Sequence, residues 1–365
     1  MSELPPLSFA RGAPSLDIID VEGLREAAQR AFANDPGGVT RYGTAVGYEP
    51  LRRWIAERHG VAENEVLVTN GSMQADAFLF DEMVKPGDDI VVELPTYDRT
   101  LLSLRQHGAK ITPIPLKPDG IDTLGLSDAL DGGLRPKLAH IIPNFQNPAG
   151  YTLSGHKREQ LLELASAHGF VIFEDDPYIS LRFRGETLPT MLSLDGGAGR
   201  VVYASSFSKT VCPGIRVGFL IGPADLIAAI AERATNTYIS PSMVDAGIVY
   251  EFCVSGAIER SIETVRAALQ ERVDTLAAEL HERIPAASFV APDGGYFLWV
   301  KLPEGVDDPA AVLKAAGERG LALVSGDDFV LDGGSGAVRI AFSGVTPEEI
   351  RDGVARLAAA IETLG

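Results

Sequence analysis

The chain has 365 residues, 45% hydrophobic and 22% charged, a composition typical of a globular enzyme with one large and one smaller domain. Its formal net charge of -18 disfavours nucleic acid and anionic membranes as partners, although a local group of Arg and Lys can still bind an anion. The two cysteines, Cys212 and Cys253, and the scattered histidines predict neither a disulfide framework nor a metal site.

The N-terminal region contains Gly12, Pro14 and the segment 36–38, where regular secondary structure is expected to be interrupted. We expect residues 1–38 to form a segment that packs on a small C-terminal domain. The first six residues lack the basic and apolar regions of a secretory signal, and no apolar run reaches the roughly 18 residues of a membrane span. We therefore expect a cytoplasmic protein.

Short apolar strands then alternate with helical patterns, such as the one over 154–168. Continuous apolar runs are typical of strands that are covered on both faces of a parallel sheet. The pattern predicts an α/β fold with a mainly parallel sheet between helices, in a large domain over 39–260. The predicted strands are 66–69, 90–92, 138–142, 170–173, 201–204 and 217–221.

A long amphipathic helix follows, because apolar residues recur at intervals of three and four from Ile258 to Ile284. A helix of this length often connects two lobes. We expect the strand and helix patterns beyond it to form a smaller α/β domain over 261–365.

The most informative segment is Ser206-Phe207-Ser208-Lys209, which follows an apolar strand and precedes Arg216. A lysine that forms a Schiff base needs an anchored cofactor and a desolvated pocket that lowers its pKa. Two hydroxyls and a guanidinium can hold a phosphate beside the amine. A solvated loop is the alternative interpretation of this segment taken alone.

Polar residues follow other predicted strands as well. Asn70-Gly71-Ser72-Met73 opens a helix and offers an anion site, with plain N-capping by Ser72 as the alternative. Tyr97 can stack on a planar ring, and Asn147 can donate to a ring oxygen or simply form an Asn-Pro turn. Because parallel strands end at one edge of a sheet, we expect these groups to meet there.

The strand over 170–173 runs into Glu174-Asp175-Asp176-Pro177-Tyr178. A buried carboxylate needs a cation, and a protonated pyridine nitrogen is one. Tyr178 lies three residues on and can reach the neighbouring ring oxygen. A solvated acidic turn is the other interpretation.

These motifs, with Asn147-Pro148-Ala149-Gly150 and Pro213-Gly214-Ile215-Arg216, resemble fold-type I pyridoxal-phosphate enzymes. The similarity is to class I/II aminotransferases, in particular the 2-aminoadipate and aromatic aminotransferase subgroup and the effector domains of related transcription factors. We expect no DNA-binding module here. The resemblance implies pyridoxal 5'-phosphate bound by Ser72, Met73, Tyr97, Asn147, Asp175, Tyr178, Ser206, Ser208, Lys209 and Arg216, with Lys209, Asp175 and Tyr178 catalytic.

The resemblance also implies substrate contacts and a second subunit. Arg339 matches the arginine that holds the substrate α-carboxylate, with Asn147 beside it. Tyr42 matches a tyrosine that reaches the cofactor phosphate of the neighbouring subunit in a homodimer. Gly12 and Arg11 are expected near the substrate, where Arg11 either holds a distal carboxylate or faces solvent.

The expected reaction is amino-group transfer between an L-amino acid and a 2-oxo acid with ping-pong kinetics. The same residues are compatible with β-elimination, decarboxylation or oxidation of an amino acid, because the fold does not decide which Cα bond breaks. A non-catalytic ligand-binding protein is the alternative from a different class.

Overall fold

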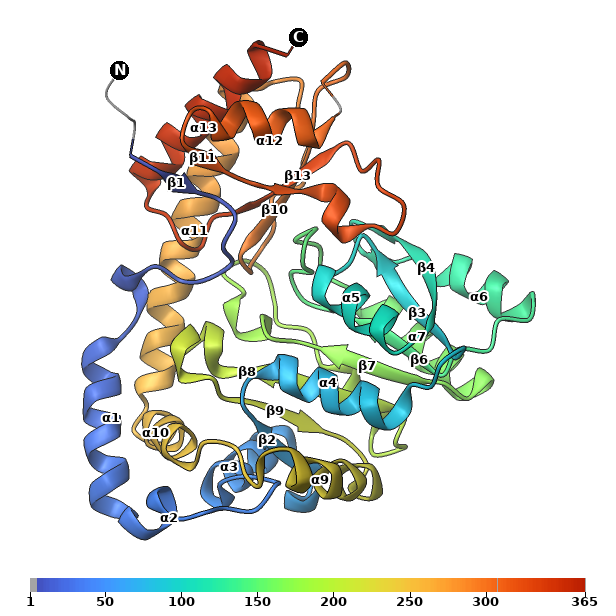
Figure 1. Cartoon of the computed structure of the whole chain (residues 1–365), viewed down its shortest axis with the longest axis vertical. Helices are drawn as coiled ribbons and strands as arrows, with labels where there is room; N and C mark the ends of the chain where they lie inside the picture. The colour runs from blue at the N-terminus through green and yellow to red at the C-terminus, as the bar shows by residue number, and fades with distance from the viewer. Residues whose placement is uncertain (1–4, 307, 365) are drawn as a thin grey trace.

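The computed structural model describes residues 5–306 and 308–364, and its centre is a sheet with helices on both faces (Figure 1). In the described part this sheet has eight strands in the order β2-β9-β8-β7-β6-β3-β4-β5. Their bounds are β2 Val66–Thr69, β3 Asp89–Leu94, β4 Lys110–Lys117, β5 Gly120–Ile121, β6 Leu138–Ile141, β7 Val171–Asp175, β8 Val201–Ser206 and β9 Gly218–Ile221.

The sheet is mainly parallel. Strands β4, β3, β6, β7 and β8 pair in parallel, while β9 is antiparallel to both β8 and β2. Strand β2 therefore runs in the same direction as the parallel strands and ends at the same edge. The α/β fold class predicted from the alternating patterns is confirmed.

Sequence patterns identified six of these strands and missed β4 and β5. Strand β4 contains Pro113 and Pro115, which lack the N–H that a central strand must donate. Its outer neighbour is only the two-residue β5, so this region is close to a sheet edge, where proline is tolerated.

Each face of the sheet is covered because successive side chains in a strand point to opposite sides. Ile90 and Val92 pack with α4 (Ser72–Met83), α5 (Asp98–Gln106) and α9 (Ala224–Tyr238). Val91 packs with α6 (Thr123–Asp131) and α7 (Gly155–His168) on the other face. The predicted helix over 154–168 is α7, whose first turn is capped by Ser154.

The described part of the N-terminal segment has two packing partners. Strand β1 (Leu7–Ser8) pairs in parallel with β11 (Leu321–Ala322) of the C-terminal region. Helices α1 (Val21–Asn34) and α2 (Pro36–Thr40) instead pack with α10 (Met243–Val254) and α3 (Glu49–His59), so their contacts are with the large domain. Residues 1–4 of the predicted segment lie outside the described residues.

The predicted long helix is α11 (Ala257–Arg283), which runs from α10 to the smaller lobe (Figure 1). Its buried side chains belong to two cores: Ile258 and Ile262 pack in the large domain, and Val265 onward pack in the C-terminal core. That lobe contains β10 Phe297–Lys301, α12 Pro309–Gly317, β12 Val324–Ser325, β13 Ala337–Ala341 and α13 Pro347–Glu362.

Residues 5–306 and 308–364 contain neither a membrane-spanning helix nor a cluster of metal-binding side chains. None of their helices is both long enough and apolar enough to cross a bilayer. They also contain no group of three or more His, Cys, Asp or Glu side chains that could hold a metal ion.

Candidate active site

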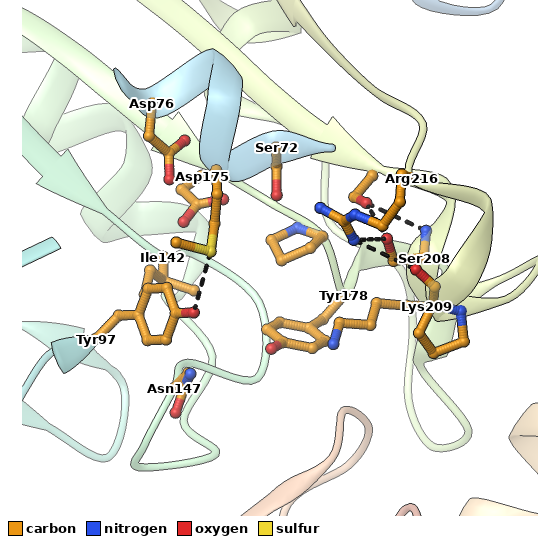
Figure 2. A pocket seen from close by; sticks show the side chains of 14 residues that line it. Ser72, Asp76, Tyr97, Ile142, Asn147, Asp175, Tyr178, Ser208, Lys209 and Arg216 are labelled. Atoms are coloured by element: carbon orange, nitrogen blue, oxygen red, sulfur yellow. Dashed lines mark hydrogen bonds between the residues drawn. The ribbon is translucent and has the colours of Figure 1, made fainter. Parts of the chain in front are cut away.

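The predicted site residues gather at the edge of the sheet where β2, β7 and β8 end. Gly218 of β9 pairs with Thr69 at the end of β2 and with Ser206 at the end of β8. A cavity of about 160 Å³ opens at this edge (Figure 2). Its lining residues are Ser72, Met73, Asp76, Tyr97, Ile142, Asn147, Asp175, Pro177, Tyr178, Ser206, Ser208, Lys209, Pro213 and Arg216.

One end of the cavity has the donors that an anion requires. Helix α4 begins at Ser72 after Gly71, whose φ of 88° only glycine adopts readily, and the first N–H groups of a helix have no partner within the helix. Arg216 donates through Nη1 to Ser208 Oγ at 3.3 Å. Ser208 N in turn donates to Ser206 Oγ at 3.1 Å. Hydroxyls, a guanidinium and a helix N-terminus thus converge.

The backbone at this anion end is packed too closely for side chains. A Cβ on Gly218 would lie 2.5 Å from Ser72 N, and one on Gly71 would lie 2.1 Å from Arg216 Nη2. Arg216 itself has a φ of 49°, a left-handed conformation that is uncommon outside glycine. The two glycines therefore allow α4 and the Lys209 segment to approach each other.

Lys209 lies at the middle of the cavity, at the end of a short 3₁₀ turn, Phe207–Lys209. Its Nζ donates to Gly12 O at 2.8 Å and lies 5.1 Å from the centroid of the Tyr296 ring. Burial lowers the pKa of Lys209 to about 8, with help from the positive charges of Arg339 and Arg216. The neutral, nucleophilic form of this amine is therefore about a tenth of the total at pH 7, far more than for an ordinary lysine.

The opposite end of the cavity carries an acid, Asp175, at the end of β7. Its carboxyl is buried, and its Oδ1 has no hydrogen-bond partner among the described residues. The nearest basic atom is His140 Nε2, 3.5 Å from Asp175 Oδ2. A buried carboxylate without a full cation partner is costly, so this geometry is suited to a cationic ligand group.

Three predicted residues line the space between these two ends. Tyr97 is half-buried, and among the described residues its hydroxyl has one hydrogen-bond partner, the sulfur of Met73, at 3.9 Å. Tyr178 is buried, with its ring edge-on to Phe297. Asn147 accepts a hydrogen bond through Oδ1, which leaves its Nδ2 as the atom that can donate into the cavity.

Arg339 lies on β13 of the smaller lobe. Its Nη1 donates the hydrogen bond that Asn147 Oδ1 accepts, at 3.0 Å. Its Nη2 donates to Ala10 O at 2.7 Å, while its buried Nε has no partner among the described residues. Arg339 lines a second cavity, of about 410 Å³, together with Lys209 and Gly12. The arginine and the lysine thus face one space.

Of the remaining predicted residues, Tyr42 and Arg11 do not line the cavities, whereas Gly12 does. The side chain of Tyr42 is on the surface, 84% exposed, and does not line either cavity within this chain. Arg11 is exposed and is likewise absent from both linings. Gly12 does line the larger cavity, and a Cβ there would lie 2.3 Å from the Phe297 ring. Its backbone therefore approaches the site as no larger residue could.

Sequence reasoning missed several residues of the site. Asp76 lines the smaller cavity, and its position four residues after Ser72 in α4 is the signal that places both on one helix face. His140 on β6 lies two residues before Ile142, a lining residue just past the end of that strand, and the alternation of an extended chain places both on one face. Pro177 and Pro213 also line the cavity but have no distinctive spacing.

Comparison with known proteins identifies the class to which this fold and site belong. The family of aminotransferases of class I and II matches residues 6–357. Aromatic-amino-acid aminotransferase 1 of Thermococcus litoralis is 32% identical over 368 residues, covering 98% of this chain and 88% of the relative. The 2-aminoadipate transaminase of Thermus thermophilus is 31% identical, covering 98% and 90%.

A solved structure agrees with these relatives. The crystal structure of alpha-aminoadipate aminotransferase from Thermus thermophilus, complexed with N-(5'-phosphopyridoxyl)-L-leucine, superimposes with a TM-score of 0.93. It is 30% identical and the match covers 98% of this chain and 92% of that one. The chain belongs to the class I and II aminotransferases, and the resemblance predicted from its motifs is confirmed. These matches favour transamination over the other reactions of an amino acid.

Pyridoxal 5'-phosphate is the cofactor of this family, and the cavity fits it in three respects. The end near Arg216 offers donors for a phosphate. Lys209 presents to an aldehyde an amine whose pKa is lowered to about 8. Asp175 Oδ1, buried and without a partner among the described residues, offers a negative charge to a protonated ring nitrogen.

Proposed function

We propose that this chain transfers amino groups at the cavity that contains Lys209, with Lys209 as the residue that binds the cofactor. The single observation that carries the assignment is that Lys209 and the unpartnered carboxyl of Asp175 line one cavity in the described part of the chain. Its other end holds the hydroxyls and the guanidinium of the anion site. An anion site, an amine and an acid in this order along the cavity match a phosphorylated pyridine aldehyde.

The roles of the remaining residues follow from their places. When bound, pyridoxal phosphate supplies an electron sink for the negative charge formed as the substrate loses its Cα proton. Asp175 keeps a negative charge at the ring nitrogen. Lys209, once its amine is free, takes the proton from Cα and returns it, since a group with a pKa near the working pH does both.

Arg339 is the proposed partner of the substrate carboxylate. Its Nε has no partner among the described residues, and its two terminal nitrogens are oriented by Asn147 and Ala10. A fixed guanidinium can bind a carboxylate through two parallel hydrogen bonds, which a lysine cannot do. The shared cavity of Arg339 and Lys209 is therefore the proposed substrate site.

The substrate side chain is a narrower proposal. We propose aromatic amino acids and 2-aminoadipate as the first compounds to test, because the two relatives described above are named for these substrates. Arg11 as the partner of a distal carboxylate stays a prediction. Loss of 2-aminoadipate turnover in Arg11→Ala, with aromatic turnover intact, would support it, and equal turnover of both would contradict it.

A homodimer completes the proposal. Tyr42 is a large aromatic residue that is exposed in the single chain, which is compatible with a place in the partner subunit's cavity. Tyr42→Ala would then weaken cofactor binding in a dimer, as measured by cofactor titration and sedimentation. A monomeric wild-type protein would contradict the arrangement. A cytoplasmic location stays a prediction from the sequence.

The decisive experiment compares Lys209→Ala with Lys301→Ala, the same change at an exposed position. We expect borohydride to attach the cofactor covalently to the peptide that contains Lys209 in the wild type and in Lys301→Ala, and not in Lys209→Ala. Transamination should disappear with the attachment. Retention of both by Lys209→Ala would refute the assignment.

The reaction type is tested by a single turnover with one amino acid. Pyridoxamine phosphate and a 2-oxo acid are the products expected of transamination. Pyruvate with ammonia, or carbon dioxide, would instead indicate elimination or decarboxylation.

A further inference from the structure

Asp76 is a second acid in the cavity. It lies one helical turn after Ser72 in α4, on the face that lines the cavity, and Figure 2 shows its carboxyl beside that of Asp175. Its Oδ1 is inaccessible and has no hydrogen-bond partner among the described residues. Asp76 thus borders the cavity at the end away from Arg216 (Figure 2).

The groups around the pair formed by Asp76 and Asp175 come from different strands. Asp175 itself ends β7, Glu93 on β3 and His140 on β6 lie near Asp175, and Tyr97, which follows β3, lies near both acids. Glu93 already accepts from Ile142 N at 3.1 Å and from Gln146 Nε2 at 3.3 Å.

No arginine or lysine in residues 5–306 and 308–364 lies within ion-pair distance of Asp76 or Asp175. His140 Nε2, at 3.5 Å from Asp175 Oδ2, is the nearest base, and both of its ring nitrogens lack a hydrogen-bond partner within these ranges. Two carboxyls thus share a buried site without a fixed cation.

Two such groups cannot both ionise at low cost. Like charges in one site raise one pKa strongly, and the two protons then leave in separate steps that belong to the pair. Burial, and then the negative charge of Asp175, raise the pKa of Asp76 well above its ordinary value. The protonated form of Asp76 is therefore stabilised at this end of the free cavity.

We propose that Asp76 and Asp175 hold a single proton between them, and that this proton leaves the site when the cofactor binds with its ring nitrogen protonated. The proposal rests on the proposed function, since it needs the ring nitrogen at this end. The proton balance is one exchange with solvent: one carboxyl O–H breaks, its proton passes to solvent, and two carboxylates are left beside one pyridinium. The ring nitrogen of free pyridoxal phosphate already carries its own proton near neutral pH, so it takes none from the acids.

The test counts protons exchanged with solvent when pyridoxal phosphate binds to the apoprotein, by calorimetry in buffers of different ionisation enthalpy. In Asp76→Asn the amide has no such proton to release, so this variant should release about one proton fewer per site than the wild type. Other titrating groups, such as Lys209, contribute equally to both. Asp81→Asn, the same change at an exposed position of α4, should match the wild type.

Equal proton release by the wild type and Asp76→Asn would overturn the proposal. Release that is lost in His140→Gln but kept in Asp76→Asn would place the proton on the imidazole and overturn it as well. A wild-type protein that binds no cofactor, or in which borohydride attaches none to Lys209, would instead overturn the proposed function.

A second measurement on the wild type alone covers the case in which Asp76→Asn does not fold. With ¹³C-labelled aspartate carboxyls, the infrared band of a protonated carboxyl should be present in the apoprotein and lost on cofactor binding. A band that persists unchanged would show that the acid pair does not release its proton, and would overturn the proposal.

Discussion

The two ends of the cofactor cavity are built on opposite principles. At the anion end, Ser206, Ser208 and Arg216 are joined to one another by hydrogen bonds. At the acid end, Asp175 and Asp76 each present a buried oxygen that has no partner among the described residues. The first end is preformed, whereas the second is left incomplete until a cation is bound.

This difference separates affinity from reactivity. Preformed donors bind a phosphate with little reorganisation, so changes at the anion end should appear mainly in the cofactor dissociation constant. The acids at the other end influence the charge of the ring and so the ease of proton loss from the substrate, which appears in the rate. The predictions below test this division, from the largest expected effect to the smallest.

The largest effect is expected from Asp175→Asn. The amide keeps the shape but removes the charge that favours a protonated ring, which is worth about one to three pK units and hence roughly 10- to 1000-fold in rate. We expect kcat for transamination to fall by that factor, with the cofactor dissociation constant changed by less than about tenfold. Asp81→Asn is the control. An unchanged kcat would show that the acid end does not govern reactivity.

Arg216→Ala should have the converse effect to Asp175→Asn, weakening cofactor binding with little change in kcat. A hydrogen bond to a charged group contributes about 1.5 to 3 kcal/mol, so losing the guanidinium should weaken cofactor binding roughly 10- to 150-fold. At saturating cofactor, kcat should remain close to that of the wild type. Equilibrium titration of the apoprotein measures the first quantity. A variant with normal affinity and low kcat would reverse the assignment of the two ends.

The lowered pKa of Lys209, which lies between the two ends, predicts the pH dependence of cofactor attachment. Only the neutral amine attacks an aldehyde, and the neutral fraction rises with pH up to the pKa of about 8. The attachment rate should therefore rise about tenfold from pH 6 to 7 and level off above about 8. Stopped-flow absorbance of the apoprotein with pyridoxal phosphate measures it. A rate that still rises tenfold per unit at pH 9 would contradict the lowered pKa.

The smallest effect is expected at Tyr97. Among the described residues its hydroxyl has one hydrogen-bond partner, Met73 Sδ at 3.9 Å, so Tyr97→Phe should change kcat and cofactor affinity by less than about threefold. Tyr97→Ala removes the ring that can stack on the cofactor and should weaken binding by roughly a few-fold to tenfold. Equal losses in both variants would show that the hydroxyl, and not the ring, contributes.

Sequence patterns located the anion end more completely than the acid end. Ser206, Ser208, Lys209 and Arg216 lie within eleven residues after one strand, so their chemistry could be recognised as a segment. The acid end combines residues from α4, β6 and β7, and only Asp175 was recognised. Asp76 and His140 look like ordinary helix and strand residues until the fold places them beside that acid.

By itself, the sequence determined the alternation of strands and helices, the family and the cofactor, and it led to Lys209 as the proposed reactive lysine, because these depend on local periodicity and on short motifs. Only the tertiary structure decided that Gly218 joins the ends of β2 and β8, and that Arg339 from the smaller lobe meets Asn147. Such contacts join residues far apart in the chain, and no local pattern encodes a distance between them. The same holds for the charge balance of the two buried acids, which depends on what else is packed around them.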